Sequence, residues 1–222
     1  KADKVRIVFP WYDVKTAREI PVEENRFIKK FHIHQDKFYV QFAGTIGYVF
    51  DCKTVIELAK RLKDEQDIVL QIVGDGNVKA KFEEDIKKAG LTNIQLYPLQ
   101  PIELVPDVYS AGSVCLIPLR KGVISNGVPS KAPILMACNR VIINSVDIDS
   151  EYARMFNENE IGECINIGDY DKLAQRIKFL RNSPEVLERM ANNAHRYSIE
   201  HFSSKANTRK YMDIFDEIGK KK

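Results

Sequence analysis

Residues 128–131 read Val-Pro-Ser-Lys and open the stretch that decides the fold. The apolar run 134–138 predicts a short buried helix after this turn, and residues 141–143 then predict a strand. Ser130 is a residue type that favours the N-cap, and free N–H groups at a helix N-terminus attract anions. Lys131 adds a positive charge there, so the stretch predicts a phosphate site. A capped helix with a solvated lysine is the alternative that these residues alone leave open.

Apolar runs of strand length alternate with segments of helical period along the rest of the chain. The expected strands cover residues 5–9, 38–43, 68–73, 94–97, 114–118, 141–143 and 161–167. One helix is expected to begin near residue 51, another to end at Gly90, and a third to lie within 101–111 with a break at Pro106. Further helices are expected to begin at 131, near 169 and at 184, and the last to cover 203–218. This alternation is typical of parallel strands covered on both faces. The sequence therefore predicts an α/β protein with a Rossmann-like, doubly wound parallel sheet and C-terminal helices.

Composition places the chain among ordinary globular proteins, with 222 residues, 44% of them hydrophobic and 29% charged. The formal charge of +3 is too small to argue for nucleic acid. The four cysteines form no Cys-x-x-Cys motif, which argues against zinc and a redox pair and favours a reducing, cytoplasmic setting. The chain begins without Met and runs almost at once into the strand expected at 5–9, so we expect a piece of a longer polypeptide.

Four loops follow expected strands and should meet at one edge of the sheet, because ligands bind beyond the carboxyl ends of such strands. They cover residues 44–47, 74–76, 98–100 and 120–131. Glycines in the first loop let a diphosphate approach the backbone, although an ordinary tight turn has the same pattern. Acidic residues at 147–151 also follow an expected strand, where solvated charge is the simpler interpretation. The histidines show no metal-ligand spacing.

Five short motifs occur in an order that resembles a known family. They are residues 42–47 (Phe-Ala-Gly-Thr-Ile-Gly), 72–76 (Ile-Val-Gly-Asp-Gly), 94–98, 109–118, and 128–131 with Met136-Ala137. Together they resemble the C-terminal, donor-binding half of a GT-B glycosyltransferase of the retaining family 4 type. The branch that synthesises bacterial polysaccharides is the most similar. The resemblance spans roughly residues 5 to 218.

The resemblance implies transfer of a sugar from a UDP-linked donor with retained anomeric configuration, and neither an essential metal nor another cofactor. It implies that the donor diphosphate contacts Gly44, Thr45, Gly47, Ser130 and Lys131. The nucleoside would lie against Gly74, Asp75, Gly76, Pro98, Leu99 and Gln100. The donor sugar and ribose would lie near Asn126, Gly127 and Ile134.

The chain departs from the family pattern at its charged positions. Many members carry two Glu residues eight positions apart where this chain has Asn126 and Ile134, so no catalytic residue can be assigned. Many also carry an Arg and, five residues later, a Lys where this chain has Thr45 and Phe50. We favour Lys131 as the replacement cation among the four nearby candidates, which are Lys53, Arg120, Lys121 and Lys131.

The resemblance also implies a domain organisation. Residues 1–222 would form one nucleotide-sugar-binding domain, with an irregular lead-in at 1–36 and a terminal helix and tail at 203–222. The N-terminal acceptor domain of a GT-B enzyme is absent, so we expect no turnover by this chain alone. The expected partners are that domain, a nucleotide-sugar and, for the parent protein, the inner membrane face. A non-catalytic partner subunit and an unrelated Rossmann-like nucleotide-binding domain are the alternatives.

Overall fold

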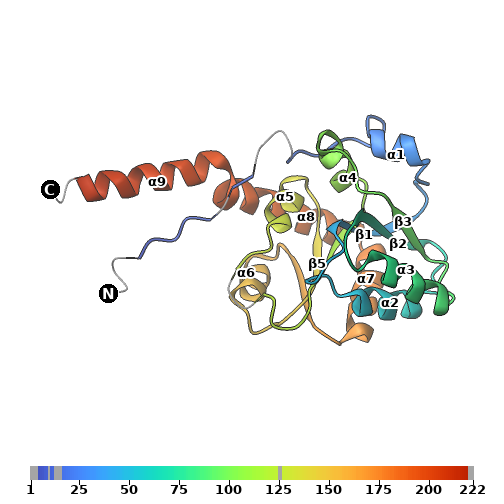
Figure 1. Cartoon of the computed structure of the whole chain (residues 1–222). Helices are drawn as coiled ribbons and strands as arrows, with labels where there is room; N and C mark the ends of the chain where they lie inside the picture. The colour runs from blue at the N-terminus through green and yellow to red at the C-terminus, as the bar shows by residue number, and fades with distance from the viewer. Residues whose placement is uncertain (1–4, 10, 13–16, 125–126, 220–222) are drawn as a thin grey trace.

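The computed structural model describes residues 5–9, 11–12, 17–124 and 127–219. Within these ranges lies an all-parallel, six-stranded sheet in the order β3-β2-β1-β4-β5-β6 (Figure 1). The strands are β1 (Phe38–Thr45), β2 (Ile68–Asp75), β3 (Ile94–Tyr97), β4 (Val114–Pro118), β5 (Ile142–Val146) and β6 (Gly162–Asn166). This order is that of a doubly wound Rossmann sheet, so the predicted fold class is confirmed. The order reverses between β1 and β4, which is where such sheets bind ligands.

Helices cover both faces of the sheet. They are α1 (Arg26–Phe31), α2 (Cys52–Arg61), α3 (Lys79–Lys88), the 3₁₀ turn η2 (Ile102–Leu104), α4 (Val105–Ser110), α5 (Lys131–Ala137), α6 (Glu151–Asn159), α7 (Tyr170–Arg181), α8 (Pro184–Phe202) and α9 (Ser204–Gly219). In the part of the chain that the structure describes, no helix combines the length and apolar character needed to span a bilayer.

Alternating side chains of the strands form separate apolar clusters on the two faces. Val40, Leu70 and Leu116 point to one face, where they pack with apolar residues of α2, α3 and α7. Tyr39 and Cys115 point to the other face, where α1 and α4 cover one half and α5, α6 and α8 cover the other. Because both faces are buried, the strands are nearly continuous apolar runs, as parallel sheets require.

The strand predicted at residues 5–9 is wrong. This segment does not join the sheet, and Val5 and Ile7 are 65% and 76% exposed. It lies along α9 instead, which extends away from the sheet (Figure 1). Arg6 pairs with Glu217 at 2.9 Å, and the Trp11 ring meets the Tyr211 ring edge-on. An apolar run becomes a strand only beside another strand edge, and this segment has α9 as its neighbour.

Helix α6 is not predicted from the sequence. Its N-cap is Ser150, whose hydroxyl accepts from the Ala153 N–H, and Glu151 occupies its first turn. The acidic stretch 147–151 therefore joins the end of β5 to the start of α6. Asp147 accepts a 2.8 Å hydrogen bond from the Gly122 N–H, which ties the loop after β4 to the end of β5.

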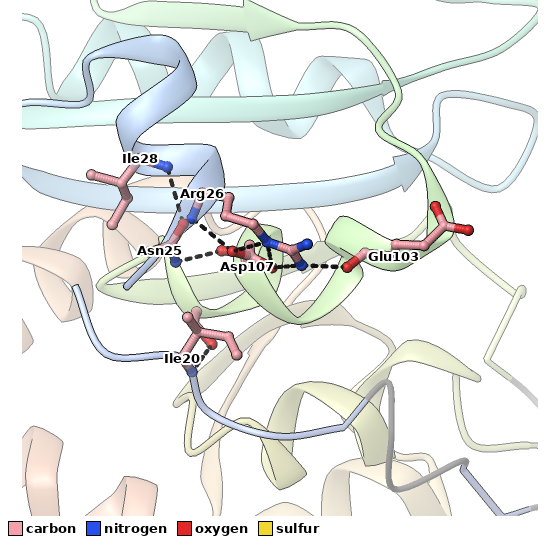
Figure 2. Close-up of polar contacts among 7 residues, drawn as sticks. Ile20, Asn25, Arg26, Ile28, Glu103 and Asp107 are labelled. Carbon is pink, nitrogen blue, oxygen red and sulfur yellow. Dashed lines mark hydrogen bonds and ion pairs between the residues drawn. The ribbon is translucent and has the colours of Figure 1, made fainter. Parts of the chain in front are cut away.

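A buried polar cluster joins the lead-in to α4 (Figure 2). Asp107 is 1% exposed and accepts from the backbone and the guanidinium of Arg26, whose second partner is the Glu103 carbonyl. Asn25 caps α1 and donates to the Asp107 carbonyl. Burial alone would raise the pKa of Asp107, but the hydrogen bonds from Arg26 outweigh it and lower that pKa. The carboxylate therefore stays charged and fixes α1 over the β1–β2 half of the sheet.

Candidate functional site

The main candidate site is a pocket of about 520 Å³ at the point where the strand order reverses. Phe42 and Thr45 of β1, the end of β4, the loop that follows it and the start of α5 form its walls. Its volume is that of a typical small-molecule site. Two of the predicted loops, at 44–47 and 120–131, thus meet at this edge.

Lys131 is the first residue of α5, and its side chain extends across the end of β1. Its Nζ lies 4.3 Å from the centre of the Phe42 ring, a cation–π contact. A Cβ on Gly44 would collide with the Lys131 ammonium, and the φ of Gly44, +145°, is one that other residues rarely adopt. The absence of a side chain at Gly44 therefore leaves the space that the Lys131 ammonium occupies.

Among the described residues, Lys131 has no counter-ion. No carboxylate of the described residues lies within 4.0 Å of its Nζ or lines the pocket. Burial lowers its pKa from 10.5 to about 8, because the charged form loses hydration that no anion replaces. An anion that entered the pocket would supply the missing charge, so the site favours anionic ligands.

Ser130 occupies the N-cap position of α5, as predicted, but it does not cap the helix through its side chain. Ser130 has helical dihedral angles (φ −57°, ψ −21°), and its side chain makes no capping hydrogen bond. The Ala132 N–H already bonds to the Pro129 carbonyl at 2.9 Å, and Pro133 has no N–H to offer. The start of α5 therefore has fewer free donors than an ordinary helix N-terminus, and the ammonium of Lys131 is its principal positive group. Ser130 itself lines the pocket.

Helix α8 holds α5 from behind. The buried Ser198 hydroxyl donates to the Pro133 carbonyl at 2.7 Å, and Nδ1 of His195 lies 3.0 Å from the Ala137 carbonyl oxygen. These contacts use the carbonyls of the third and the last residue of the short helix. They fix the direction in which Lys131 leaves α5.

The loop after β2 lies directly against the loop after β1. A Cβ on Gly74 would collide with the Gly44 carbonyl, and the Ile46 N–H donates to the Asp75 carbonyl at 2.8 Å. The Asp75 carboxylate accepts from the Gly76 N–H and remains at the surface. Gly74, Asp75 and Gly76 therefore flank the β1 loop without lining the pocket itself.

The loop after β3 stands apart from the pocket lining. The Gln100 side chain turns inward, where it accepts from Lys30 Nζ at 3.0 Å and donates to the Pro98 carbonyl at 2.6 Å. Leu99 is 63% exposed. The two contacts of Gln100 use one of the two N–H donors and one of the two acceptor positions of its amide and hold it beside the loop.

The three positions expected near the donor sugar differ in where they lie relative to the pocket. Gly127 lines the pocket, and Asn126 lies outside the described residues. Ile134 does not line the pocket but packs, partly buried, against the apolar cluster beneath it.

The other candidate cations lie in a separate hollow. Lys53, Arg120 and Lys121 line a space of about 580 Å³ between the starts of α2 and α3. The Arg120 guanidinium lies 5.3 Å from the centre of the exposed Tyr48 ring. Phe50, where the resemblance implies a Lys in many family members, is 1% exposed and packs on Phe42. Only Lys131 of the four candidates reaches the main pocket.

Residues 23–197 match the family model described as glycosyl transferases group 1. The chain belongs to this family. Its sequence is 29% identical over 133 residues to WcaI of Escherichia coli K12, named as a colanic acid biosynthesis glycosyl transferase. That match covers 59% of this chain and 32% of WcaI, so the chain spans only part of the length of this relative.

Solved structures of glycosyltransferases share the fold. HepE from Anabaena, solved with UDP and glucose, is 13% identical and matches with a TM-score of 0.75 over 98% of this chain and 58% of that chain. The C-terminal domain of the group 1 glycosyl transferase LpcC from Francisella tularensis matches with a TM-score of 0.64. It is 17% identical over 85% of this chain and 96% of that chain. The described residues thus have the architecture of a GT-B glycosyltransferase domain, as the resemblance implied.

The contact between Lys131 and Gly44 can be tested through the titration of the lysine. In Gly44→Ala the new methyl group pushes the ammonium off Phe42 towards water, so the pKa of Lys131 should return from about 8 towards 10.5. NMR of a ¹³C-labelled Lys131 side chain measures it. Gly127→Ala is the matched control, because a Cβ there meets nothing within 4 Å. An unchanged pKa in Gly44→Ala would contradict the geometry described here.

Proposed function

We propose that this chain is the donor-binding domain of a retaining glycosyltransferase that moves a hexosyl group from a UDP-linked donor to a polysaccharide or lipid-linked acceptor. The observation that carries the proposal is Lys131, a cation with no counter-ion among the described residues, at the ligand-binding edge of a group 1 glycosyl transferase fold. UDP and glucose in the related HepE structure support the choice of donor. The resemblance to the family 4 type adds that no essential metal is required.

The chemistry of sugar transfer explains what the lysine would do. When the bond between the sugar and the diphosphate breaks, negative charge builds up on the departing phosphate oxygen. A positive group already in place stabilises that charge without reorganisation, and its effect is larger in apolar surroundings. Lys131 meets both conditions, since the aromatic ring of Phe42 lies beneath it and apolar side chains form much of the wall. It would therefore stabilise the leaving group.

The remaining predicted contacts follow from this placement. The diphosphate would lie across Gly44, Thr45, Gly47 and Ser130, and the nucleoside would extend over the loops that contain Gly74, Asp75, Gly76, Pro98, Leu99 and Gln100. The donor sugar would lie beside Gly127. A separate N-terminal domain would bind the acceptor, so the chain alone should bind the donor but should not transfer its sugar. We propose that the parent enzyme works in the cytoplasm at the inner membrane face.

A second candidate function is binding without catalysis, as the partner subunit of an active transferase. The observation that favours it is the absence of any carboxylate from the described lining of the pocket. Sugar transfer by the full-length protein, assayed with a lipid-linked acceptor, would decide for the enzyme. If the full-length protein binds the donor but does not transfer the sugar, the partner-subunit function is supported.

The role of Lys131 predicts a loss of UDP affinity when its charge is removed. Lys131→Met keeps most of the apolar stem, and it should weaken UDP binding about 10- to 100-fold, the size of one charge-assisted contact. Isothermal titration calorimetry at pH 7 measures this. Lys63→Met, at an exposed lysine outside both hollows, is the control and should bind as the wild type does. Equal affinities for the two variants would remove the basis of the proposal.

The lowered pKa of Lys131 also predicts how binding depends on pH. The ammonium binds the diphosphate and the neutral amine does not, so UDP affinity should be constant below a pH of about 8 and fall above it. UDP itself changes little in this range, because the second ionisation of a phosphate is complete well below pH 8. Calorimetry from pH 7 to 9.5 should show up to about a tenfold loss per pH unit. In Lys131→Met this step should vanish; a step that persists there belongs to another group.

A further inference from the structure

A lysine of α1 holds the loop that follows β3. The Lys30 ammonium donates to Oε1 of Gln100 at 3.0 Å, and Nε2 of the same amide donates to the Pro98 carbonyl at 2.6 Å. An ammonium can only donate and a carbonyl can only accept, so these two partners together fix which way the amide faces. The buried Gln100 side chain thus links α1 to the backbone at the start of the loop.

Helix α1 also contacts the chain on both sides of this loop. The rings of Phe27 and Phe31 pack on the ring of Tyr97, the last residue of β3, with centroids 5.5 and 5.1 Å apart. Beyond the loop, the Arg26 guanidinium donates to the Glu103 carbonyl at 2.6 Å (Figure 2). The loop is therefore attached to α1 before it, within it and after it, and Lys30 makes the attachment within it.

The backbone of the loop has donors that the protein does not use. No hydrogen bond joins the N–H of Leu99 or Gln100 to another described residue, and Pro98 and Pro101 have no N–H. The loop lies at the carboxyl end of β3, the edge at which such sheets bind ligands. A nucleobase with ring carbonyls would supply acceptors for these two donors. The conformation of the loop decides where the donors point.

We propose that Lys30 is a positioning residue for the nucleoside of the donor, because it holds Gln100 and through it the loop that contacts the base. This inference rests on the proposed function. Lys30 lines neither hollow, and among the described residues its ammonium has no carboxylate partner. Its Nζ lies 5.1 Å from the centre of the Phe31 ring, which keeps the side chain beside the loop. A loop that is already ordered loses less conformational entropy when the nucleoside binds.

The test separates the nucleoside from the diphosphate. In Lys30→Met the amide loses its ammonium partner, so UDP should bind the 222-residue chain about three- to tenfold more weakly, the size of one hydrogen bond. Inorganic pyrophosphate lacks the nucleoside and should bind Lys30→Met and the wild type alike, because Lys131 is unchanged. NMR of the ¹³C-labelled Lys131 side chain follows both titrations. Lys29→Met, at the adjacent exposed lysine of α1, is the matched control and should bind UDP as the wild type does.

Further variants test whether Lys30 acts through Gln100. Lys30→Arg restores a charged donor and should recover the UDP affinity. Gln100→Met should weaken UDP binding at least as much as Lys30→Met, and combining the two should add no further loss. An unchanged UDP affinity in folded Lys30→Met, or an equal loss of pyrophosphate binding, would overturn the inference. Failure of UDP to bind the wild type would instead refute the proposed function.

Discussion

The ammonium of Lys131 lies over Phe42 because residue 44 has no side chain. The other features of the site depend on this contact. The strand order places the end of β1 beside β4 and the start of α5, and α8 holds α5 so that the lysine crosses the gap. The same surroundings that position the ammonium also remove water from it, which lowers the pKa of Lys131. The site therefore favours an anionic ligand.

The sheet could be predicted because each buried parallel strand is a distinct apolar run. β1, β2 and β4 are buried on both faces, so their sequences are apolar almost throughout. The failures have a common cause, which is that local sequence does not show what a segment packs against. Residues 5–9 have the composition of a strand but lie along α9. α6 has only nine residues and buries Tyr152, Ala153 and Phe156, so its helical spacing extends over little more than one turn.

The site could be predicted only in part. The strand–loop pattern placed Gly44 and Lys131 at one edge, and the structure brings them into contact. The pattern could not show that Pro129 and Pro133 remove the need for a Ser130 cap, or that Gln100 turns inward to Lys30. It also gave no sign that Val123 and Val128 line the pocket, because in the sequence both look like ordinary loop residues. Where the resemblance implies an Arg and a Lys after β1, this chain has Thr45 and Phe50, and Lys131 is the charged side chain among the described pocket residues.

The most direct test of this account is a crystal structure of the chain with UDP bound. We predict a phosphate oxygen about 3 Å from Lys131 Nζ, the distance of a charge-assisted hydrogen bond, above the Phe42 ring and beside Gly44. A diphosphate bound instead in the hollow of Lys53, Arg120 and Lys121, with Lys131 free of ligand, would contradict the account.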